Sequence, residues 1–118
     1  MYDDDIQAET TFNFKKNGVN TTQMKHLKRA QHLVSIDLHG LTQQEAKHKL
    51  THVLSGNHPQ MFKIVHGKGQ HNPDATPVLK IMVYHFLKDD PNVLAFCSAK
   101  PNDGGAGATY VLTKKEGV

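Results

Sequence analysis

The segment Leu33-Val34-Ser35-Ile36-Asp37-Leu38-His39-Gly40 is the strongest indication of the fold in this 118-residue chain. Apolar and polar residues alternate along it, and this period of two predicts a strand with one buried face. Asp37 and His39 then share the exposed face, with their Cβ atoms about 6.5 to 7 Å apart. Because Gly40 lets the chain turn, both side chains lie at the end of the strand, which indicates a functional site. The predicted buried face comprises Val34, Ile36 and Leu38.

The length and composition predict one domain in a cytoplasmic protein. No apolar run reaches the roughly 18 residues that a membrane helix needs, so we expect no membrane partner. The acidic start, residues 1–5, differs from the basic start of a signal peptide. Cys97 is the only cysteine, which excludes a disulfide framework and a cysteine-based metal site.

Positive charge is concentrated after the acidic N-terminus. The net charge of the whole chain is +3, but four of the 11 acidic residues fall within the first nine positions. Residues 10–118 therefore carry 14 Lys and Arg against 7 acidic residues, a net charge of +7. The 9 histidines add positive charge below neutral pH. A basic body of this kind favours nucleic acid as a partner.

The N-terminal part of the chain divides into two segments. Residues 1–20 lack a sustained period and are expected to form a tail or a loosely docked arm. Residues 21–32 predict a basic helix ahead of the domain, with Thr21 or Thr22 as its N-cap. A solvated helix face and a phosphate-contacting face both fit this composition. Its candidate phosphate ligands are Lys25, Lys28 and Arg29.

A second helix is predicted directly after the first strand. Thr42 and Glu45 form a capping box, and an apolar stripe over residues 46–54 supplies a buried side. His48 and His52 have the spacing of zinc ligands on a helix. Neither a glutamate at position 49 nor a third ligand supports a metal site there, so we expect none.

The rest of the chain continues the alternation of strands and helices. Thr76 is the expected N-cap of the next helix, with Pro77 in its first turn. The order β-α-β-α-β-β predicts an α/β fold in which helices pack on a mixed sheet. The predicted elements are strand 61–65, helix 79–87, strand 93–98, a loop at 100–107 and strand 108–113.

Three glycine-containing segments each follow one of the first three strands. Strands joined through a helix in one sheet run parallel, so these segments are expected to meet at one edge of the sheet. Nearby helix N-termini favour an anion, and glycine lets a backbone approach closely. Each segment alone also fits a plain turn; their convergence favours a phosphate site. The segments are His39-Gly40, His66-Gly67-Lys68-Gly69 and Asp103-Gly104-Gly105-Ala106-Gly107.

The same segments resemble the Smr (small MutS-related) domain family. The resemblance rests on three motifs in the family's order, between about residues 21 and 113, and the segment 23–29 is similar to the one ahead of the domain in stand-alone bacterial Smr proteins. Many members lack the polar insert Gln70–Ala75, with His71 and Asp74, which bears on the choice of substrate. The motifs are Ile36-Asp37-Leu38-His39-Gly40-Leu41-Thr42, His66-Gly67-Lys68-Gly69 and Gly104-Gly105-Ala106-Gly107-Ala108-Thr109.

The resemblance implies a fold, an activity and partners. The fold would be a two-layer α/β sandwich over residues 33–118, similar to the C-terminal domain of bacterial translation initiation factor three. The activity would be nicking or endonuclease cleavage of DNA or RNA. Some relatives cut messenger RNA on stalled ribosomes, which makes the ribosome a candidate partner.

Cleavage of a phosphodiester needs proton transfer and stabilisation of the phosphoryl oxygens. The family's Asp-x-His pair falls on Asp37 and His39. We expect His39 to act as general base or acid, with Asp37 orienting its imidazole or raising its pKa, and His66 to take the opposite role. If the strand holds Asp37 and His39 too far apart for direct contact, a water or the substrate bridges them. With RNA, a histidine pair could activate the 2′-hydroxyl without a metal; with DNA, a divalent metal such as Mg²⁺ on Asp37 and His39 becomes attractive. The candidate phosphate ligands are Gly67, Lys68, Gly69, Gly104 and Gly105.

Two other classes of function fit parts of this pattern. A module that binds nucleic acid without cutting it explains the basic body and Lys68, but explains Asp37 poorly because an acid repels phosphate. A small-molecule phosphatase or nucleotide binder fits the site, although the resemblance does not suggest it. We therefore rank an endonuclease first and a binding module second.

Overall fold

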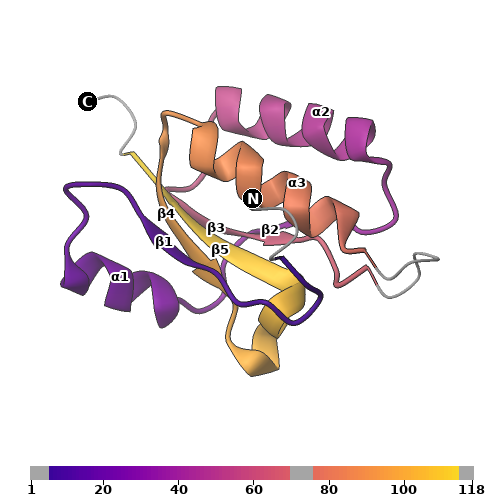
Figure 1. Cartoon of the computed structure of the whole chain (residues 1–118). Coiled ribbons are helices and arrows are strands. Elements are labelled where there is room, and N and C mark those ends of the chain that lie inside the picture. The colour runs from indigo at the N-terminus through magenta and orange to yellow at the C-terminus, as the bar shows by residue number, and fades with distance from the viewer. Residues whose placement is uncertain (1–5, 70–75, 115–118) are drawn as a thin grey trace.

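The computed structural model describes residues 6–69 and 76–114, so the insert Gln70–Ala75 and the first five residues lie outside the described part. Five strands form one mixed sheet in the order β1-β4-β5-β3-β2 (Figure 1). The elements are β1 (Asn13–Lys15), α1 (Thr21–Lys28), β2 (Ser35–Asp37), α2 (Gln43–Ser55), β3 (Met61–Val65), α3 (Val78–Asp89), β4 (Val93–Ser98) and β5 (Ala108–Thr113), with short 3₁₀ turns at Pro101–Asp103 and Gly105–Gly107.

The directions of the strands agree with the sequence. β2 and β3 pair in parallel, whereas β5 lies antiparallel to both β3 and β4. β2, β3 and β4 therefore run the same way, and their carboxyl ends lie at one edge of the sheet. The predicted mixed sheet with helices packed on it is confirmed.

Helices cover both faces of the sheet. α2 and α3 pack on one face, and α1 lies on the other (Figure 1). The central strand β5 is buried along its whole length, and its side chains alternate between the two cores. Val111 belongs to the core under α2 and α3, whereas Tyr110 packs with Met24 and Leu27 of α1. The sheet that carries the glycine segments is thus packed on both faces, with one hydrophobic core on each.

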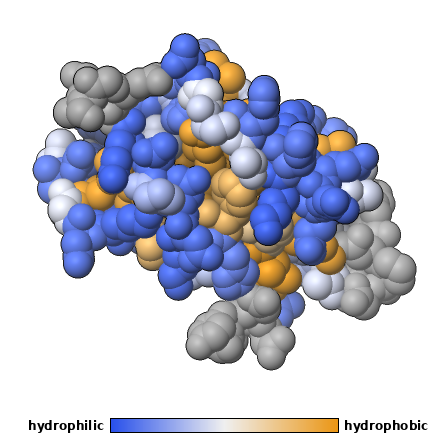
Figure 2. Space-filling view, turned by 90° about the horizontal axis from the view of Figure 1, so that it is seen from above, coloured by the Kyte–Doolittle hydropathy of each residue, from blue (hydrophilic) through white to orange (hydrophobic). Residues whose placement is uncertain are grey.

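The outer surface of the molecule on the side of α2 and α3 is largely hydrophilic. Figure 2 views the molecule from this side and shows an apolar strip between hydrophilic side chains. An open groove of about 520 Å³ between the two helices is lined partly by Ile81, Met82 and Phe86. Among the described residues, no helix is both long and apolar enough to cross a bilayer.

The first predicted strand is shorter than its pattern indicated. β2 covers only Ser35–Asp37, and Val34 is 57% exposed rather than buried. β2 is an edge strand with β3 as its neighbour, and the paired register begins at Ser35. Ile36 and Leu38 are buried as predicted. The prediction for Val34 was wrong because alternation alone does not show at which residue strand pairing begins or which side chains a helix covers.

The N-terminal segment is part of the folded body. β1 pairs antiparallel with β4, and Ile6, Phe12 and Val19 are buried. For residues 6–20 the structure therefore differs from the tail or loosely docked arm that the sequence indicated. A strand of three residues is too short to show a period. The predicted domain boundary at residue 33 stays a prediction.

Helix starts agree with the sequence at α2 and differ at the other two helices. Thr42 and Glu45 form the predicted capping box. The N-cap of α1 is Asn20 rather than Thr21 or Thr22, because the Asn20 side chain accepts the backbone N–H of Gln23. α3 begins at Val78, with Pro77 rather than Thr76 as its N-cap.

Candidate functional site

An open groove of about 690 Å³ lies where β2 and β3 end, between the starts of α2 and α3. We call it the first groove. The end of β2 contributes His39 and Gly40 to its wall, and the end of β3 contributes His66 to Gly69. Two of the three predicted segments therefore meet here. The remaining lining residues are Leu41, Thr42, Gln43, Val65, Val78 and Leu79.

Asp37 and His39 are in direct contact at this groove. The Asp37 Oδ1 atom accepts the backbone N–H of His39 at 3.1 Å and lies 2.5 Å from His39 Nδ1. The chain leaves the extended conformation after Asp37, so the ring folds back onto the carboxylate instead of standing 6.5 Å or more away. Of the two arrangements that the sequence left open, the direct one is present.

Both members of this pair face solvent. The His39 side chain is 70% exposed and that of Asp37 is 54% exposed. The hydrogen bond from the His39 ring lowers the pKa of Asp37, helped by the His39 backbone N–H and by Lys49, so the carboxylate is ionised at neutral pH. Lys49 also donates its Nζ to the Asp37 carbonyl at 3.0 Å, a contact that the sequence did not indicate. With Nδ1 held by the carboxylate, Nε2 is the ring nitrogen left for a substrate.

His66 occupies a very different environment. It is 3% exposed, with Nδ1 lying 2.8 Å from the Gly67 carbonyl and Nε2 2.9 Å from Thr109 Oγ1. A carbonyl only accepts, so Nδ1 donates to it and Nε2 accepts the hydroxyl of Thr109. Burial lowers the pKa of His66 to about 4, so the ring is neutral at physiological pH. The predicted acid–base role of His66 does not fit this geometry, because both ring nitrogens are already engaged.

The third glycine segment supports the first groove from behind. The Gly107 carbonyl accepts the backbone N–H groups of His66 at 3.1 Å and Gly67 at 2.9 Å. Gly69 has a φ of +74°, and a Cβ there would lie 2.5 Å from Pro77 Cα. Glycine is therefore required where the chain leaves β3 and passes the start of α3. Of the glycines predicted to bind phosphate, only Gly67 and Gly69 line this groove.

Lys68 joins the first groove to a second one. The second groove has a volume of about 600 Å³, and its lining includes Lys68, Lys28, Gly104 and Gly105. The other predicted phosphate ligands of this segment, Lys25 of α1 and its C-cap Arg29, line neither groove. The structure thus distinguishes Lys28, which lines the second groove, from Lys25 and Arg29, a difference that the sequence did not show.

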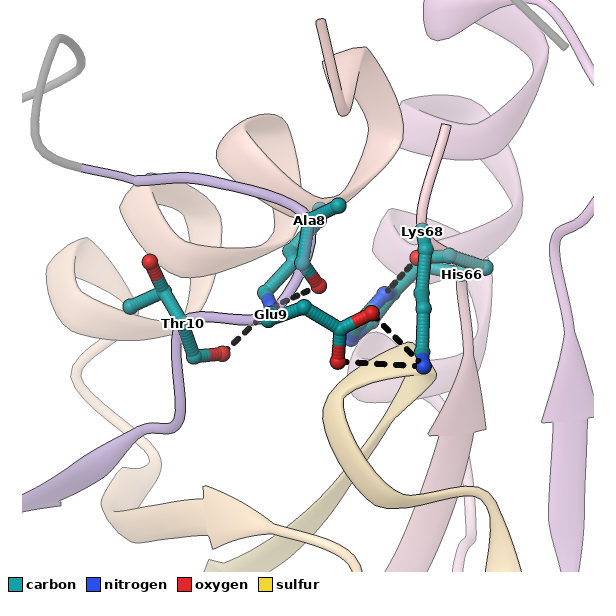
Figure 3. Close-up of polar contacts among 7 residues, drawn as sticks. Ala8, Glu9, Thr10, His66 and Lys68 are labelled. Carbon is teal, nitrogen blue, oxygen red and sulfur yellow. Dashed lines mark hydrogen bonds and ion pairs between the residues drawn. The ribbon is translucent and has the colours of Figure 1, made fainter. Parts of the chain in front are cut away.

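A glutamate already lies on Lys68. The Lys68 Nζ atom is 3.1 Å from Glu9 Oε1 and 3.0 Å from Glu9 Oε2 (Figure 3). Buried Lys80 of α3 holds the flanking residues by donating to the carbonyls of Ala8, at 3.0 Å, and Thr10. Burial lowers the pKa of Lys80 to about 8. The sequence missed both lysine contacts, since Glu9 belongs to the expected tail and Lys80 interrupts an apolar helix pattern.

The donors for a metal ion are few. Across residues 6–69 and 76–114, no group of three or more His, Cys, Asp or Glu is placed to hold a metal. Asp37 and His39 supply two donors, and Asp37 Oδ1 is already occupied by His39. Mg²⁺ usually takes one or two carboxylates from the protein and completes its octahedron with water and substrate phosphates, and Asp37 supplies one such carboxylate.

The fold and the site define a small α/β domain with a carboxylate–histidine pair beside a lysine- and glycine-lined groove. Comparison with family models gives a match to the Smr domain over residues 36–114. The chain belongs to this family, which confirms the resemblance seen in its motifs.

Two curated relatives are ribosome rescue factor SmrB proteins. The chain is 33% identical over 112 residues to the one from Vibrio vulnificus (strain CMCP6), covering 91% of this chain and 60% of that protein. It is 32% identical over 116 residues to the one from Yersinia enterocolitica serotype O:8 / biotype 1B, covering 94% of this chain and 62% of that protein. This chain thus spans about three-fifths of the length of these relatives.

Two solved structures are similar in fold. YdaL, a stand-alone small MutS-related protein from Escherichia coli, has a TM-score of 0.75 at 23% identity, covering 98% of this chain and 92% of that one. The Smr domain of Thermus thermophilus MutS2 has a TM-score of 0.52 at 28% identity, covering 70% of this chain and all of that one. The similarity to YdaL extends over the N-terminal elements as well as the domain core.

Proposed function

We propose that this chain is an endonuclease that cleaves the phosphodiester backbone of RNA in the first groove. The observation that supports this most is the direct contact of exposed Asp37 with His39, which lines the first groove. A carboxylate that holds one ring nitrogen fixes the imidazole and stabilises its protonated form. The other ring nitrogen can then exchange a proton with a substrate.

The chemistry follows from this arrangement. Nε2 of His39 takes the proton of a ribose 2′-hydroxyl, and the 2′-oxygen attacks the neighbouring phosphorus. The bond to the 5′-oxygen of the next nucleotide breaks, and this oxygen takes a proton from water. The products are a 2′,3′-cyclic phosphate and a 5′-hydroxyl. Lys68 stabilises the negative charge that develops on the phosphoryl oxygens.

In this proposal His66 is a positioning residue. Its hydrogen bonds to Gly67 and Thr109 tie the segment that carries Lys68 to β5. The role of second acid or base, which the sequence suggested for His66, is left to water.

We propose RNA rather than DNA as the substrate because RNA carries its own nucleophile, the 2′-hydroxyl. DNA has no 2′-hydroxyl, so its cleavage calls for another nucleophile, such as a metal-activated water. Cleavage of DNA would require a bound metal ion in addition to this pair, whereas the RNA route needs only the base that His39 provides. The relatives named ribosome rescue factors also lead us to propose the ribosome as the place of action. That assignment includes a cytoplasmic location.

A direct experiment incubates the purified chain with labelled single-stranded RNA, RNA duplex and supercoiled DNA, with and without chelator. We expect cleavage of RNA that is insensitive to chelator and gives cyclic phosphate ends. A single 2′-deoxy substitution should block cleavage at that position alone. Chelator-sensitive nicking of DNA would instead support a Mg²⁺-dependent mechanism and contradict the RNA proposal.

The alternative is a non-catalytic module for nucleic acid. The anion on Lys68 and the two connected grooves favour it as much as they favour an enzyme. It leaves the Asp37–His39 contact without a purpose. Tight binding of all RNA substrates with no cleavage of any would support this alternative.

A further inference from the structure

Lys68 lies at the junction of the first and second grooves, and the second groove extends from the N-terminal segment to α1. The first groove is bordered by the starts of α2 and α3, whereas the second is bordered by Lys28 at the end of α1. α1 covers the opposite face from α2 and α3 (Figure 1). A ligand that occupies both grooves therefore passes Lys68.

An anion already occupies this junction. Both carboxylate oxygens of Glu9 contact the Lys68 ammonium, although the Glu9 side chain is 70% exposed. Lys80 donates to the carbonyls of Ala8 and Thr10, on either side of Glu9, and so anchors the segment whose carboxylate contacts Lys68. Figure 3 shows the Glu9 carboxylate beside the end of the Lys68 side chain. An exposed ion pair contributes little to stability and is readily exchanged for another anion.

We propose that the two grooves form one track for a single strand of nucleic acid, in which a backbone phosphate replaces Glu9 on Lys68 and the strand continues to Lys28. This inference rests on the proposed function, because it extends the substrate path from the first groove. A phosphodiester resembles the Glu9 carboxylate in offering negatively charged oxygens to the same ammonium. Lys28 then supplies a second positive charge farther along.

The shape of the track selects a single strand. The domain measures 44 × 30 × 27 Å, and within it the path runs from the starts of α2 and α3, past Lys68, to Lys28 at the end of α1. Duplex DNA stays straight over about 150 base pairs, far longer than this molecule. A single strand bends easily on this scale and follows a curved basic groove.

Binding measurements with non-cleavable oligomers test the track. Single-stranded 2′-deoxy oligonucleotides of three and ten nucleotides, labelled with a fluorophore, are titrated with the chain while anisotropy is followed. Lys28→Ala should weaken binding of the ten-mer about three- to tenfold and leave the three-mer unchanged. It should also reduce the slope of log affinity against log salt by about 0.7. Lys25→Ala is the matched control, an exposed lysine of the same helix that lines neither groove.

Replacing the internal anion gives an independent readout. Glu9→Gln keeps the size of the side chain and removes its charge, so both oligonucleotides should bind about two- to fivefold more tightly. Asp89→Asn removes the same charge from the exposed end of α3 and should change neither affinity. Equal effects of Lys28→Ala and Lys25→Ala on the ten-mer, or no effect of Glu9→Gln, would overturn the track.

The outcomes also separate this inference from the proposed function. One outcome is that Lys68→Ala weakens binding of the three-mer while Lys28→Ala changes the binding of neither oligonucleotide. The track is then wrong, but the proposal of a substrate site in the first groove is retained. If a ten-base-pair duplex binds as tightly as the ten-mer and is equally sensitive to Lys28→Ala, the single-strand assignment is wrong. If neither oligonucleotide binds the unaltered chain, the track is wrong, and the RNA cleavage assay alone decides the proposed function.

Discussion

His39 and His66 stand in corresponding places, each followed by glycine at the end of one of two parallel neighbouring strands. The His39 side chain is 70% exposed and contacts a carboxylate, whereas His66 is 3% exposed and contacts a carbonyl and a hydroxyl. Two similar motifs therefore provide one histidine that can exchange protons with a substrate and one that holds a loop in place.

The position of each strand in the sheet explains the difference. β2 is an edge strand, so its end has β3 on one side and solvent on the other. β3 lies between β2 and β5, and its end is covered by Thr109 of β5 and by Phe12, whose ring centroid is 6.5 Å from that of His66. Depth in the sheet, rather than the motif, distinguishes the exposed histidine from the buried one.

The largest expected effect is on catalysis by the exposed histidine. His39→Ala should lower the rate of RNA cleavage by a factor on the order of 10² to 10⁴, because a general base is lost. The free energy of unfolding should change by less than about 0.5 kcal/mol, since no buried volume is removed. Single-turnover cleavage and urea unfolding of the same preparation measure the two effects.

A matched variant of a histidine outside the site controls for the loss of an imidazole. His48→Ala on the exposed side of α2 should leave both the rate and the stability unchanged. Cleavage at the unaltered rate by His39→Ala would remove His39 from the chemistry and end its contrast with His66.

The next effect is on stability and belongs to the buried histidine. Unfolded His66 takes up a proton as the pH falls below about 6.5, whereas the folded chain resists protonation down to about 4. The unfolded state therefore binds more protons in this window, and stability is lost as the pH falls from 6.5 to 4, by up to about 3 kcal/mol. Urea unfolding at several pH values within this window gives the free energy of unfolding.

The two histidines should differ sharply in this measurement. His66→Gln keeps a donor for the Gly67 carbonyl and an acceptor for Thr109, so it should fold while losing this part of the pH dependence. His39→Gln should retain the whole pH dependence of the free energy of unfolding that His66 contributes. The difference between each variant and the unaltered chain removes the contribution of carboxylates that titrate in the same range. Parallel curves for His66→Gln and the unaltered chain would contradict the assignment.

Local chemistry made much of this fold predictable. The capping box at Thr42, strand Met61–Val65 and strand Ala108–Thr113 agree with the sequence because each is set by neighbouring residues. The meeting of the segments after β2 and β3 followed from the direction of strands joined by a helix. Alternation also placed Ile36 and Leu38 in the core.

Contacts between distant residues were not predictable in the same way. The burial of Lys80 depends on the carbonyls of Ala8 and Thr10, about 70 positions away in the chain. His66 is buried because Phe12 and Thr109 cover it, and neither is its neighbour in sequence. A periodic pattern carries no information on contacts between residues far apart in the chain. The sequence pattern therefore predicts that polar residues such as Lys80 and His66 are exposed.

The smallest expected effect concerns the carboxylate that distinguishes His39 from His66. Asp37→Asn keeps an oxygen that can accept the backbone N–H of His39 but removes a negative charge beside His39, which lines the first groove. Non-cleavable RNA should bind about two- to threefold more tightly, because the exposed charge repels phosphate only through screening solvent. Cleavage should nevertheless fall, since an amide stabilises a protonated imidazole less well than a carboxylate.

Anisotropy titrations, with Asp89→Asn as the charge control, measure the change in affinity. Weaker rather than tighter binding by Asp37→Asn would mean that the carboxylate attracts substrate through a bridging cation, and this binding should then be lost in chelator.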